Sequence, residues 1–363
     1  MGFKCGIVGL PNVGKSTLFN ALTASKIEAQ NYPFCTIEPN IGMVTVPDKR
    51  LTQLADIATS QKVIPNIMEF VDIAGLVKGA SKGEGLGNQF LGNIRSVDAI
   101  AHVVRCFDDG DITHVGGKVD PLDDIATIET ELALADIQSL EKAQIKYQKM
   151  VKSGDKQAAN ESTLLKKIMD QLNEQLHLGS LLEDDEVKEI CQRFQLLTAK
   201  PCFYIANCSE DEVGGNPHLD AVKQYAHQKG ADVVAVCAAI EAEIATLPED
   251  DRADFLAEMG MGASGLDQVI RTGYHLLGLI TFFTIGPKEA RAWTVRQGST
   301  APQAAGVIHT DFEKHFIRAE VIASNDYIAC KGEQGAKAKG LWRLEGKDYI
   351  VKDGDVLMIR ANC

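Results

Sequence analysis

Short apolar runs alternate with helix-patterned segments along the first hundred residues of the chain. The runs that predict β-strands lie at residues 5–8, 37–46, 65–73 and 98–105. Leu18, Phe19 and Leu22 fall on the same side of a helix predicted over residues 17–22, directly after the first run. Alternation of strands and helices is typical of a doubly wound α/β sheet. We therefore expect such a sheet in the N-terminal part of the chain.

The pattern becomes purely helical after Asp120 and Pro121. Apolar residues recur at helical spacing up to about residue 150, at Ile125, Ile128, Leu132 and Ala135. The turn-rich residues 153–155 follow, and the period resumes at Leu165, Ile168, Leu172 and Leu176. This pattern predicts an antiparallel helical hairpin. Its first arm of about 30 residues would reach about 45 Å.

Sheet signals return after the hairpin. The elements predicted next are a helix at 186–197, a buried strand at 201–206, a strand at 233–236 and a helix at 265–279. The hairpin is therefore an insertion within the sheet domain. From Thr281 onward, β-rich stretches and one short helix at 301–309 predict a separate small α+β domain.

The length of 363 residues is enough for two or three domains. We expect four segments: the first part of the sheet domain at 1–121, the helical insertion at 122–198, the second part of the sheet domain at 199–280, and the C-terminal domain at 281–363.

Composition is that of an ordinary soluble globular protein, with 45% hydrophobic and 24% charged residues. No apolar stretch is long enough to span a membrane, the chain enters its first predicted strand without room for a cleavable signal, and Gly6 stands where a myristoylation signal carries Ser or Thr. Nine cysteines without a Cys-x-x-Cys pair argue against a disulfide framework or a cysteine zinc site. We expect a cytoplasmic protein with reduced thiols and no membrane partner.

Charge is unevenly distributed. The formal net charge is −13, but the segment from Thr281 onward has 12 basic and 10 acidic residues, so it carries +2. Seven lysines lie between residues 142 and 167 against only Asp155 and Glu161. Any contact with nucleic acid should use these two regions.

Residues 9–16 read Gly-Leu-Pro-Asn-Val-Gly-Lys-Ser, a complete phosphate-binding loop placed after an apolar run. A buried strand, a glycine-rich turn and a helix start are the context that this motif needs, and they weigh against a chance match. Lys15 should neutralise the β- and γ-phosphates, and the Ser16 hydroxyl should bind Mg²⁺. The residues expected to contact the phosphates are Asn12, Val13, Gly14, Lys15, Ser16 and Thr17. The chain is therefore predicted to bind a nucleoside triphosphate.

Two further motifs match the switches of a P-loop nucleotide hydrolase. Asp72-Ile73-Ala74-Gly75 ends a predicted strand, so Asp72 would hold Mg²⁺ through water and the Gly75 amide would sense the γ-phosphate. Thr36 is the candidate for the first switch, where its hydroxyl and carbonyl would close on Mg²⁺ and the attacking water. Each motif alone is weak, because Asp-x-x-Gly after a strand is usually just a turn. Because both motifs follow a phosphate-binding loop in the expected order along the chain, together they predict a nucleotide-hydrolysis site.

With these motifs in place, the chain resembles the YchF-type Obg-like ATPases, a branch of the translation-factor-related P-loop GTPases. The motifs that carry the resemblance are those at residues 9–16, 32–36, 72–76, 79–91 and 207–210. The resemblance spans the whole chain. It implies an α/β fold with a P-loop sheet, an inserted helical hairpin and, from about Phe282, a C-terminal TGS-like domain of the β-grasp type.

Base selectivity depends on Asn207-Cys208-Ser209-Glu210, which stands where a GTPase carries Asn-Lys-x-Asp. In that motif the Asp carboxylate accepts two hydrogen bonds from guanine, and the Lys stem covers the base. Glu210 is one methylene longer than Asp, which displaces the carboxylate, and Cys208 replaces the Lys. Both this geometry and the resemblance favour ATP over GTP. The alternative is a Ser/Glu helix cap that makes no base contact.

Catalysis presents a gap, because Leu76 follows the switch glycine where Ras-like enzymes carry a Gln that orients water. Leucine cannot hydrogen-bond to water, so we expect slow intrinsic hydrolysis. Asn12 stands where K⁺-activated relatives coordinate potassium, which could stabilise phosphoryl charge. His114, in the polar stretch 108–114, is a second candidate that would orient the water. The alternative for His114 is a solvent-exposed loop histidine.

Lys142, Lys146 and Lys149 fall on one helical face. The simplest interpretation is a solvated helical surface, but the resemblance favours contact with the ribosome or structured RNA. The C-terminal domain would share this surface through Lys331, Lys337, Lys339 and Arg343. We expect a monomer.

Three functions remain open at this stage. The first is an ATPase switch whose hydrolysis changes ribosome affinity, the second is a scaffold that binds nucleotide as a regulatory ligand, and the third is a GTPase in which Glu210 replaces Asp.

Overall fold

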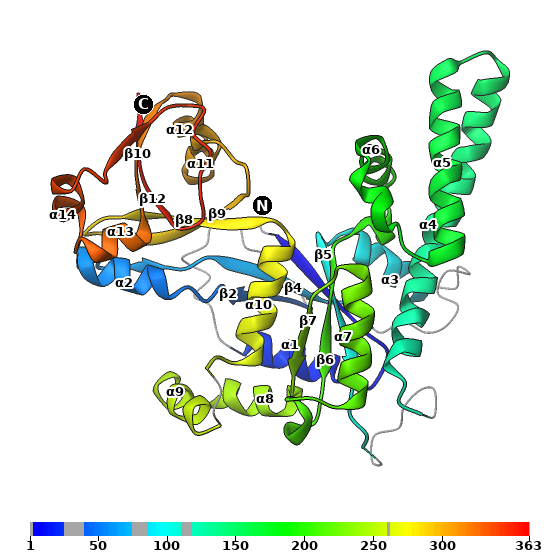
Figure 1. Cartoon of the computed structure of the whole chain (residues 1–363), viewed down its shortest axis with the longest axis horizontal. Coiled ribbons are helices and arrows are strands. Elements are labelled where there is room, and N and C mark those ends of the chain that lie inside the picture. Colours follow the sequence, from blue (N-terminus) through cyan, green and yellow to red (C-terminus); the bar gives the residue numbers. More distant parts are fainter. Residues whose placement is uncertain (1–2, 25–39, 75–85, 110–117, 260–261, 363) are drawn as a thin grey trace.

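The computed structural model describes residues 3–24, 40–74, 86–109, 118–259 and 262–362. The first of its two sheets has six strands in the order β2 (Ile41–Thr45), β4 (Ile67–Asp72), β1 (Lys4–Val8), β5 (Ala99–Arg105), β6 (Cys202–Asn207) and β7 (Val233–Val236). All neighbours in this sheet are parallel except β2 and β4. Figure 1 shows helices on both faces of the sheet, which confirms the doubly wound α/β class.

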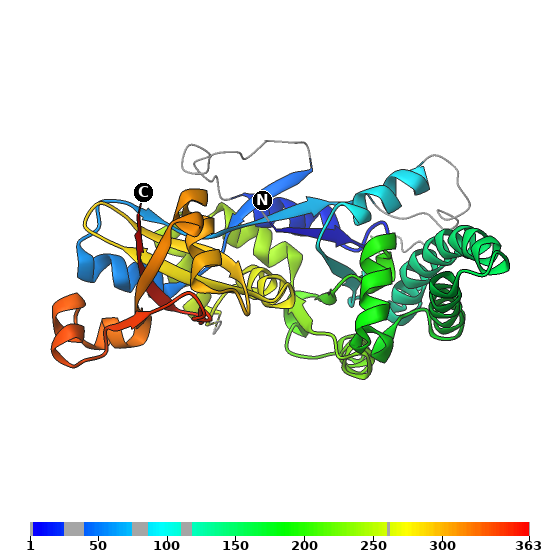
Figure 2. The same ribbon diagram turned by 90° about the horizontal axis from the view of Figure 1, so that it is seen from above.

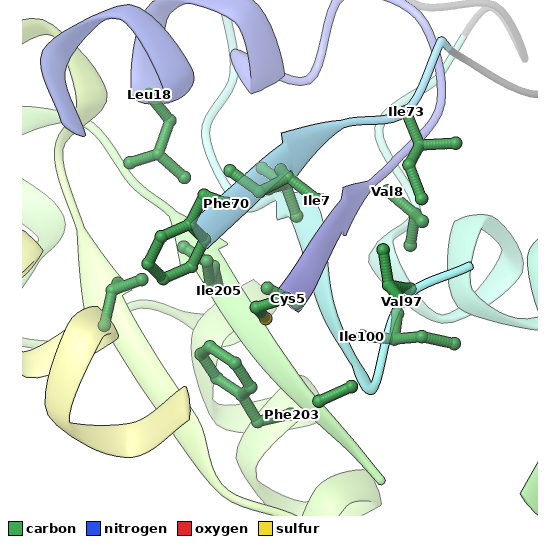
Figure 3. Packing of buried hydrophobic residues seen from close by; sticks show 14 of the residues in the cluster. Cys5, Ile7, Val8, Leu18, Phe70, Ile73, Val97, Ile100, Phe203 and Ile205 are labelled. Carbon is green, nitrogen blue, oxygen red and sulfur yellow. The ribbon is translucent and has the colours of Figure 1, made fainter. Parts of the chain in front are cut away.

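Both faces of the sheet bury apolar residues. On one face, Phe70, Phe203 and Ile205 pack with residues of β1 and α1 (Lys15–Thr23), as Figure 3 shows. α10 (Gly265–Leu276) also covers this face. On the other face, Tyr204 and Ala206 pack under α7 (Pro217–Lys229). Because successive β6 residues alternate between two buried faces, the strand is a continuous apolar run.

The predicted hairpin is confirmed. α4 (Pro121–Lys152) and α5 (Lys156–Gln175) are joined by a turn at Ser153 and Gly154. Asp120 caps α4 by accepting hydrogen bonds from Leu122 N and Asp123 N, both at 3.2 Å, and a proline at the first helical position fits such a start. Asp155 caps α5 in the same way.

The base of the hairpin is anchored to the rest of the chain. α6 (Asp185–Phe194) packs its apolar face against α4 and α5. Asp136 of α4 is buried, and its carboxylate accepts from Leu197 N, Thr198 N and Thr198 Oγ1 at 2.7–2.9 Å. Burial raises the pKa of Asp136, while these hydrogen bonds stabilise its ionised form. This contact fixes the short helix η4 (Leu197–Ala199), which leads into β6.

The second sheet forms the C-terminal unit. Its strand order is β11 (Arg343–Glu345), β10 (Phe316–Ala323), β12 (Asp355–Ala361), β8 (Leu279–Ile285), β9 (Ala290–Arg296) and β3 (Val63–Ile64). β12 and β8 are parallel, whereas β8–β9 and β10–β12 are antiparallel. The predicted short helix is α11 (Ala301–Ile308). The other short helices are α12 (Thr310–Lys314), α13 (Ser324–Ala329) and α14 (Glu333–Ala338).

One part of this unit was not predicted. β3 comes from the N-terminal segment but pairs with β9, and α2 (Lys49–Ala58) packs Leu51 and Leu54 against Phe283. Arg50 also forms an ion pair with Asp353 at 2.7 Å. Residues 49–64 therefore connect the two sheets. Figure 2 shows the C-terminal unit and the helical hairpin at opposite ends of the molecule.

Several helices were not predicted from the sequence: α3 (Leu86–Arg95), α7, α8 (Ala238–Thr246) and α9 (Glu249–Glu258). The predicted helix at 265–279 was too long. It ends at Leu276, because Gly278 adopts a left-handed conformation with φ +62° and Leu279 already begins β8.

The cysteines in the described ranges are all free thiols, and five of the seven are buried. This agrees with the prediction of reduced core cysteines. No helix among the described residues is both long enough and apolar enough to cross a membrane.

His102 of β5 should make stability depend on pH. It is 2% exposed, and burial lowers its pKa to about 4, with Glu129 opposing and Lys229 reinforcing the shift. An unfolded histidine titrates near 6.5, so only the unfolded state gains a proton between pH 6.5 and 4. The stability present above pH 6.5 is therefore lost toward pH 4, by about 3 kcal/mol in total.

We expect the His102→Gln variant to lose stability less steeply over this range than the native chain, as measured by urea denaturation at successive pH values. His227→Gln, at an exposed position, is the matched control and should keep the native slope. Parallel curves for the native chain and His102→Gln would contradict the assignment of this slope to His102.

Candidate nucleotide site

The loop between β1 and α1 has the shape that its residue types predict. Gly14 has φ +90° and directly precedes α1, and Asn12 has φ +64°. A Cβ atom on Gly9 would lie 2.8 Å from Val103 O and 2.9 Å from Val13 Cγ2. Glycine is therefore required at position 9 by close packing and at position 14 by backbone conformation.

Asn207, at the end of β6, holds this loop in place. Its Nδ2 donates to Val13 O at 2.9 Å, and its Oδ1 accepts from Ala238 N, at the start of α8, at 3.0 Å. The side chain is 4% exposed. A Cβ on Gly14 would lie only 2.2 Å from Nδ2. The first residue of the predicted base motif is thus packed directly against the phosphate loop.

Lys15 and Asp72 form an ion pair. The Lys15 ammonium, largely buried at the first turn of α1, donates to Asp72 Oδ1 at the end of β4. The predicted phosphate-binding cation and the predicted Mg²⁺-binding carboxylate thus compensate each other's charge. If a Mg·nucleotide binds, each residue of this ion pair could exchange its partner: Lys15 would pair with a phosphate group and Asp72 with the metal ion.

The residues present fit a Mg²⁺ ion. Ser16 is exposed in the first turn of α1, next to the Lys15–Asp72 pair in sequence, and it offers a hydroxyl oxygen. A hydroxyl and one carboxylate form a hard oxygen donor set of the kind that Mg²⁺ completes with substrate phosphates and water. The described residues contain no group of three or more His, Cys, Asp or Glu side chains that could hold a metal.

Three of the predicted site residues, Thr36, Gly75 and His114, lie outside the described residues, as does Leu76. Their roles stay predictions. Thr17 is described, and its side chain is exposed in α1 beside Ser16.

The two variant positions of the base motif differ in their surroundings. Cys208 is 2% exposed. A hydrogen bond between the Cys106 and Cys208 thiols raises the pKa of Cys106 and lowers that of Cys208. Glu210 is exposed and begins the short helix η5 (Glu210–Glu212). Ser209 Oγ donates to Glu212 Oε2 at 2.7 Å and does not cap η5. The interpretation of residues 209–210 as a helix cap is thus not supported by the Ser209 side chain.

Sequence reasoning missed Arg105, at the end of β5. It is 1% exposed; its Nε donates to Phe107 O at 3.1 Å, and its guanidinium also donates to Asp109 O at 3.2 Å. The guanidinium lies 4.6 Å from the centre of the Phe107 ring. Arg105 therefore fixes the start of the segment that carries His114. The only signal in the sequence is a charged residue that closes an apolar strand.

Comparison with protein-family models gives two matches. Residues 4–137 match the model described as 50S ribosome-binding GTPase. Residues 279–362 match the YchF-GTPase_C model, described as a protein of unknown function (DUF933).

Curated relatives match over the full length of both chains. The proteins named "Ribosome-binding ATPase YchF" are 62% identical in Haemophilus ducreyi, 60% in Escherichia coli O157:H7 and 52% in Bacillus subtilis. Among solved structures, the Schizosaccharomyces pombe YchF GTPase matches with a TM-score of 0.88 and 37% identity, over 99% of this chain and 98% of that chain. A GTP-binding protein from Pyrococcus horikoshii OT3, with a TM-score of 0.62 and 20% identity over 99% of this chain and 100% of its own, shares the fold.

Proposed function

The chain belongs to the YchF family, and from that premise we propose that it is a Mg²⁺-dependent ATPase of slow turnover that binds the ribosome in the cytoplasm. The observation that carries the proposal is the Lys15–Asp72 ion pair beside a phosphate loop held by Asn207. Curated relatives are named ribosome-binding ATPases, which supports both the proposed ATPase activity and the proposed ribosome binding.

Phosphate binding would rest on the backbone amides of residues 12–17 and on the N-terminal end of α1. Lys15 would leave Asp72 and neutralise the β- and γ-phosphates. Ser16 and Asp72 would hold Mg²⁺ together with Thr36, and the Gly75 amide would contact the γ-phosphate. When bound, Mg²⁺ supplies positive charge that stabilises the charge developing on the phosphate oxygens. These residues position the phosphates and balance charge, which is most of what phosphoryl transfer requires of a protein.

Slow turnover follows from Leu76, which offers water no hydrogen bond. We propose that His114 orients the attacking water and that a K⁺ ion near Asn12 adds positive charge at the phosphates. Arg105 supports the first of these roles, because it anchors the residues that precede His114.

Calorimetric binding of ATP and of GTP to nucleotide-free protein, with Mg²⁺ and K⁺, tests base selectivity. We expect ATP to bind at least about tenfold more tightly. Glu210→Asp should narrow this ratio toward GTP, because the shorter side chain restores the geometry that reads guanine. Asp211→Glu, a charge-conserving change at the exposed neighbouring position, is the control and should leave the ratio unchanged. If the native chain binds GTP as tightly as ATP, or more tightly, the proposed preference for ATP is wrong and the protein is better described as a GTPase.

Ribosome contact is proposed at the tip of the hairpin. Lys142, Lys146 and Lys149 are exposed, and Ile145 between them is 58% exposed. A basic face that also exposes an apolar side chain suits a partner that offers both phosphates and protein. The C-terminal lysines are partly engaged within the chain, since Lys337 pairs with Glu333 at 2.5 Å. We therefore propose that they contribute less to ribosome binding than the hairpin lysines do.

Charge reversal of Lys142, Lys146 and Lys149 to Glu should lower co-sedimentation with ribosomes at least about tenfold near physiological salt. The same change at Lys118, Lys223 and Lys288, exposed lysines outside the hairpin, should have little effect. Equal sedimentation of both triple variants and the native chain would remove the hairpin tip from the interface.

The alternative is a ribosome-associated scaffold for which nucleotide is only a regulatory ligand. Measurement of steady-state ATP turnover with and without ribosomes distinguishes the ATPase switch from the scaffold. A rate that stays at background under both conditions favours the scaffold, whereas stimulation by ribosomes favours the switch. We propose that the active species is a monomer.

A further inference from the structure

The backbone of Asp72, at the end of β4, is held from both sides of the strand. Toward β1, Asp72 stands in register with Ile7, and the next amide, Ile73 N, donates to Ile7 O at 3.1 Å. Toward β2, Asp72 N itself donates to Asn40 O at 2.8 Å. Asn40 directly precedes β2 and continues the ladder that this strand forms with β4. The Asn40 carbonyl therefore fixes the backbone of Asp72 from the β2 side.

Asn40 adopts a left-handed backbone conformation, with φ +69°. Few residues other than glycine adopt this conformation, and asparagine is one of those that do so most readily. The residue is exposed, and it lies at the end of an edge strand of the sheet. Strand ends open more easily than strand centres, because fewer contacts hold them. The position of the Asn40 carbonyl therefore depends on the conformation of Asn40 itself.

The direction of the Asp72 carboxylate matters once Lys15 leaves it. The side chains of Lys15 and Asp72 are 10% and 18% exposed and form an ion pair. In the proposed function a phosphate takes the place of Asp72 beside Lys15, so the ion pair no longer orients the carboxylate. The backbone of Asp72 then has to keep it in place. Mg²⁺ demands near-ideal octahedral geometry, so a misplaced carboxylate weakens its binding.

We propose that Asn40 is a positioning residue for Mg²⁺, because its left-handed backbone places the carbonyl that holds Asp72 N. This inference rests on the proposed function, in which Asp72 binds the metal. In this role Asn40 touches neither the metal nor the nucleotide and acts through the backbone of Asp72. A residue at position 40 that tolerates the left-handed conformation should therefore preserve Mg²⁺ binding, and one that avoids it should not.

Asn40→Gly and Asn40→Val carry opposite expectations. Glycine adopts the left-handed conformation without strain, whereas a β-branched residue avoids it. In calorimetric titrations with ATP, in Mg²⁺ and in EDTA, Asn40→Gly should gain as much affinity from Mg²⁺ as the native chain does. Asn40→Val should lose at least about tenfold of that gain, but it should bind ATP in EDTA as the native chain does, because the phosphate loop is unchanged. If Asn40→Val does not fold, Asn40→Ala replaces it, with an expected loss of at least about threefold.

Hydrogen exchange of the Asp72 amide reports the contact with Asn40 directly. The signal is followed by NMR in nucleotide-free protein labelled with ¹⁵N-aspartate, and it is assigned from its loss in Asp72→Ala. We expect it to exchange at least about tenfold faster in Asn40→Val than in the native chain or in Asn40→Gly. Gln195→Val is the matched control, because Gln195 is also left-handed, with φ +50°, and is exposed at the end of α6. This control should lose stability but keep both the exchange rate of Asp72 and the gain from Mg²⁺.

Three results would overturn the inference and leave the proposed function in place. The first is an unchanged gain from Mg²⁺ in folded Asn40→Val or Asn40→Ala. The second is a reduced gain with unchanged exchange at Asp72, since position 40 would then act through another contact. The third is an equal loss in Asn40→Gly and Asn40→Val, since the asparagine side chain would then be what matters. If Asp72→Ala gains as much affinity from Mg²⁺ as the native chain does, the proposed role of Asp72 is wrong, and the inference fails with it.

Discussion

Replacement of Gly14 by alanine is expected to lower the affinity for nucleotide at least about 100-fold, which corresponds to about 2.7 kcal/mol of binding free energy. Two effects act together. Gly14 has φ +90°, a conformation that costs a non-glycine residue about 1–3 kcal/mol. The new Cβ would also lie 2.2 Å from Asn207 Nδ2, so either the loop or the end of β6 must move.

Displacement of the loop matters for binding because the amides of residues 12–17 must converge on the phosphates. Calorimetric titration with ATP and Mg²⁺ measures the loss. Thermal denaturation of the same variant separates a moved loop from an unfolded chain.

Gly154→Ala is the matched control. Gly154 has the same φ of +90°, but a Cβ there would meet nothing within 4 Å, at the turn between α4 and α5. This variant should lose some folding stability through backbone strain, but it should bind nucleotide as tightly as the native chain does. Similar losses of affinity in both glycine variants would show that the loss at position 14 does not come from the contact with Asn207.

Asn207→Asp is expected to weaken nucleotide binding by about 100-fold as well. The change removes the donor to Val13 O and places a carboxylate oxygen near that carbonyl, at a position only 4% exposed. Loss of a hydrogen bond in such a place costs about 1–3 kcal/mol, and more when a charge is left behind. The acceptor for Ala238 N is retained, so α8 keeps its contact with this residue.

Asn216→Asp separates a general loss of stability from an effect on the loop. Asn216 is also buried, donates from Nδ2 to the Cys106 carbonyl at 2.8 Å and accepts from Leu219 N at 2.7 Å. It makes no contact with the phosphate loop among the interactions described. Both variants should lose stability by similar amounts in urea denaturation, but only Asn207→Asp should lose nucleotide affinity. Normal ATP binding by folded Asn207→Asp would mean that the loop keeps its shape without this anchor.

Much of the architecture was predicted from local patterns. The hairpin followed from apolar residues at helical spacing and from a turn at residues 153–155, which act within a few residues of each other. The continuous apolar run at residues 201–206 predicted a buried strand, and the structure shows that β6 is buried on both faces. α7 and α8 were missed, because their apolar residues follow the helical period only weakly.

Some residues of the candidate site could be predicted from the sequence, whereas the roles of others could not. The spacing of Gly9, Gly14, Lys15 and Ser16 predicts phosphate binding by itself, since the chemistry is local to one loop. Nothing local predicts that Asn207 would hold Val13, because the two residues are 194 positions apart. Arg105 was missed for a similar reason, since its role depends on which backbone carbonyls turn back toward it.

The sequence by itself determined the class of fold, the phosphate loop and the family, because strand and helix periods, glycine positions and motif order are properties of neighbouring residues. Only the tertiary structure decided that residues 49–64 join the C-terminal sheet, that Lys15 pairs with Asp72, and that the Asn40 carbonyl holds the Asp72 amide. These features depend on which strands and faces meet after the chain has folded. Local spacing constrains each face but does not choose its partner.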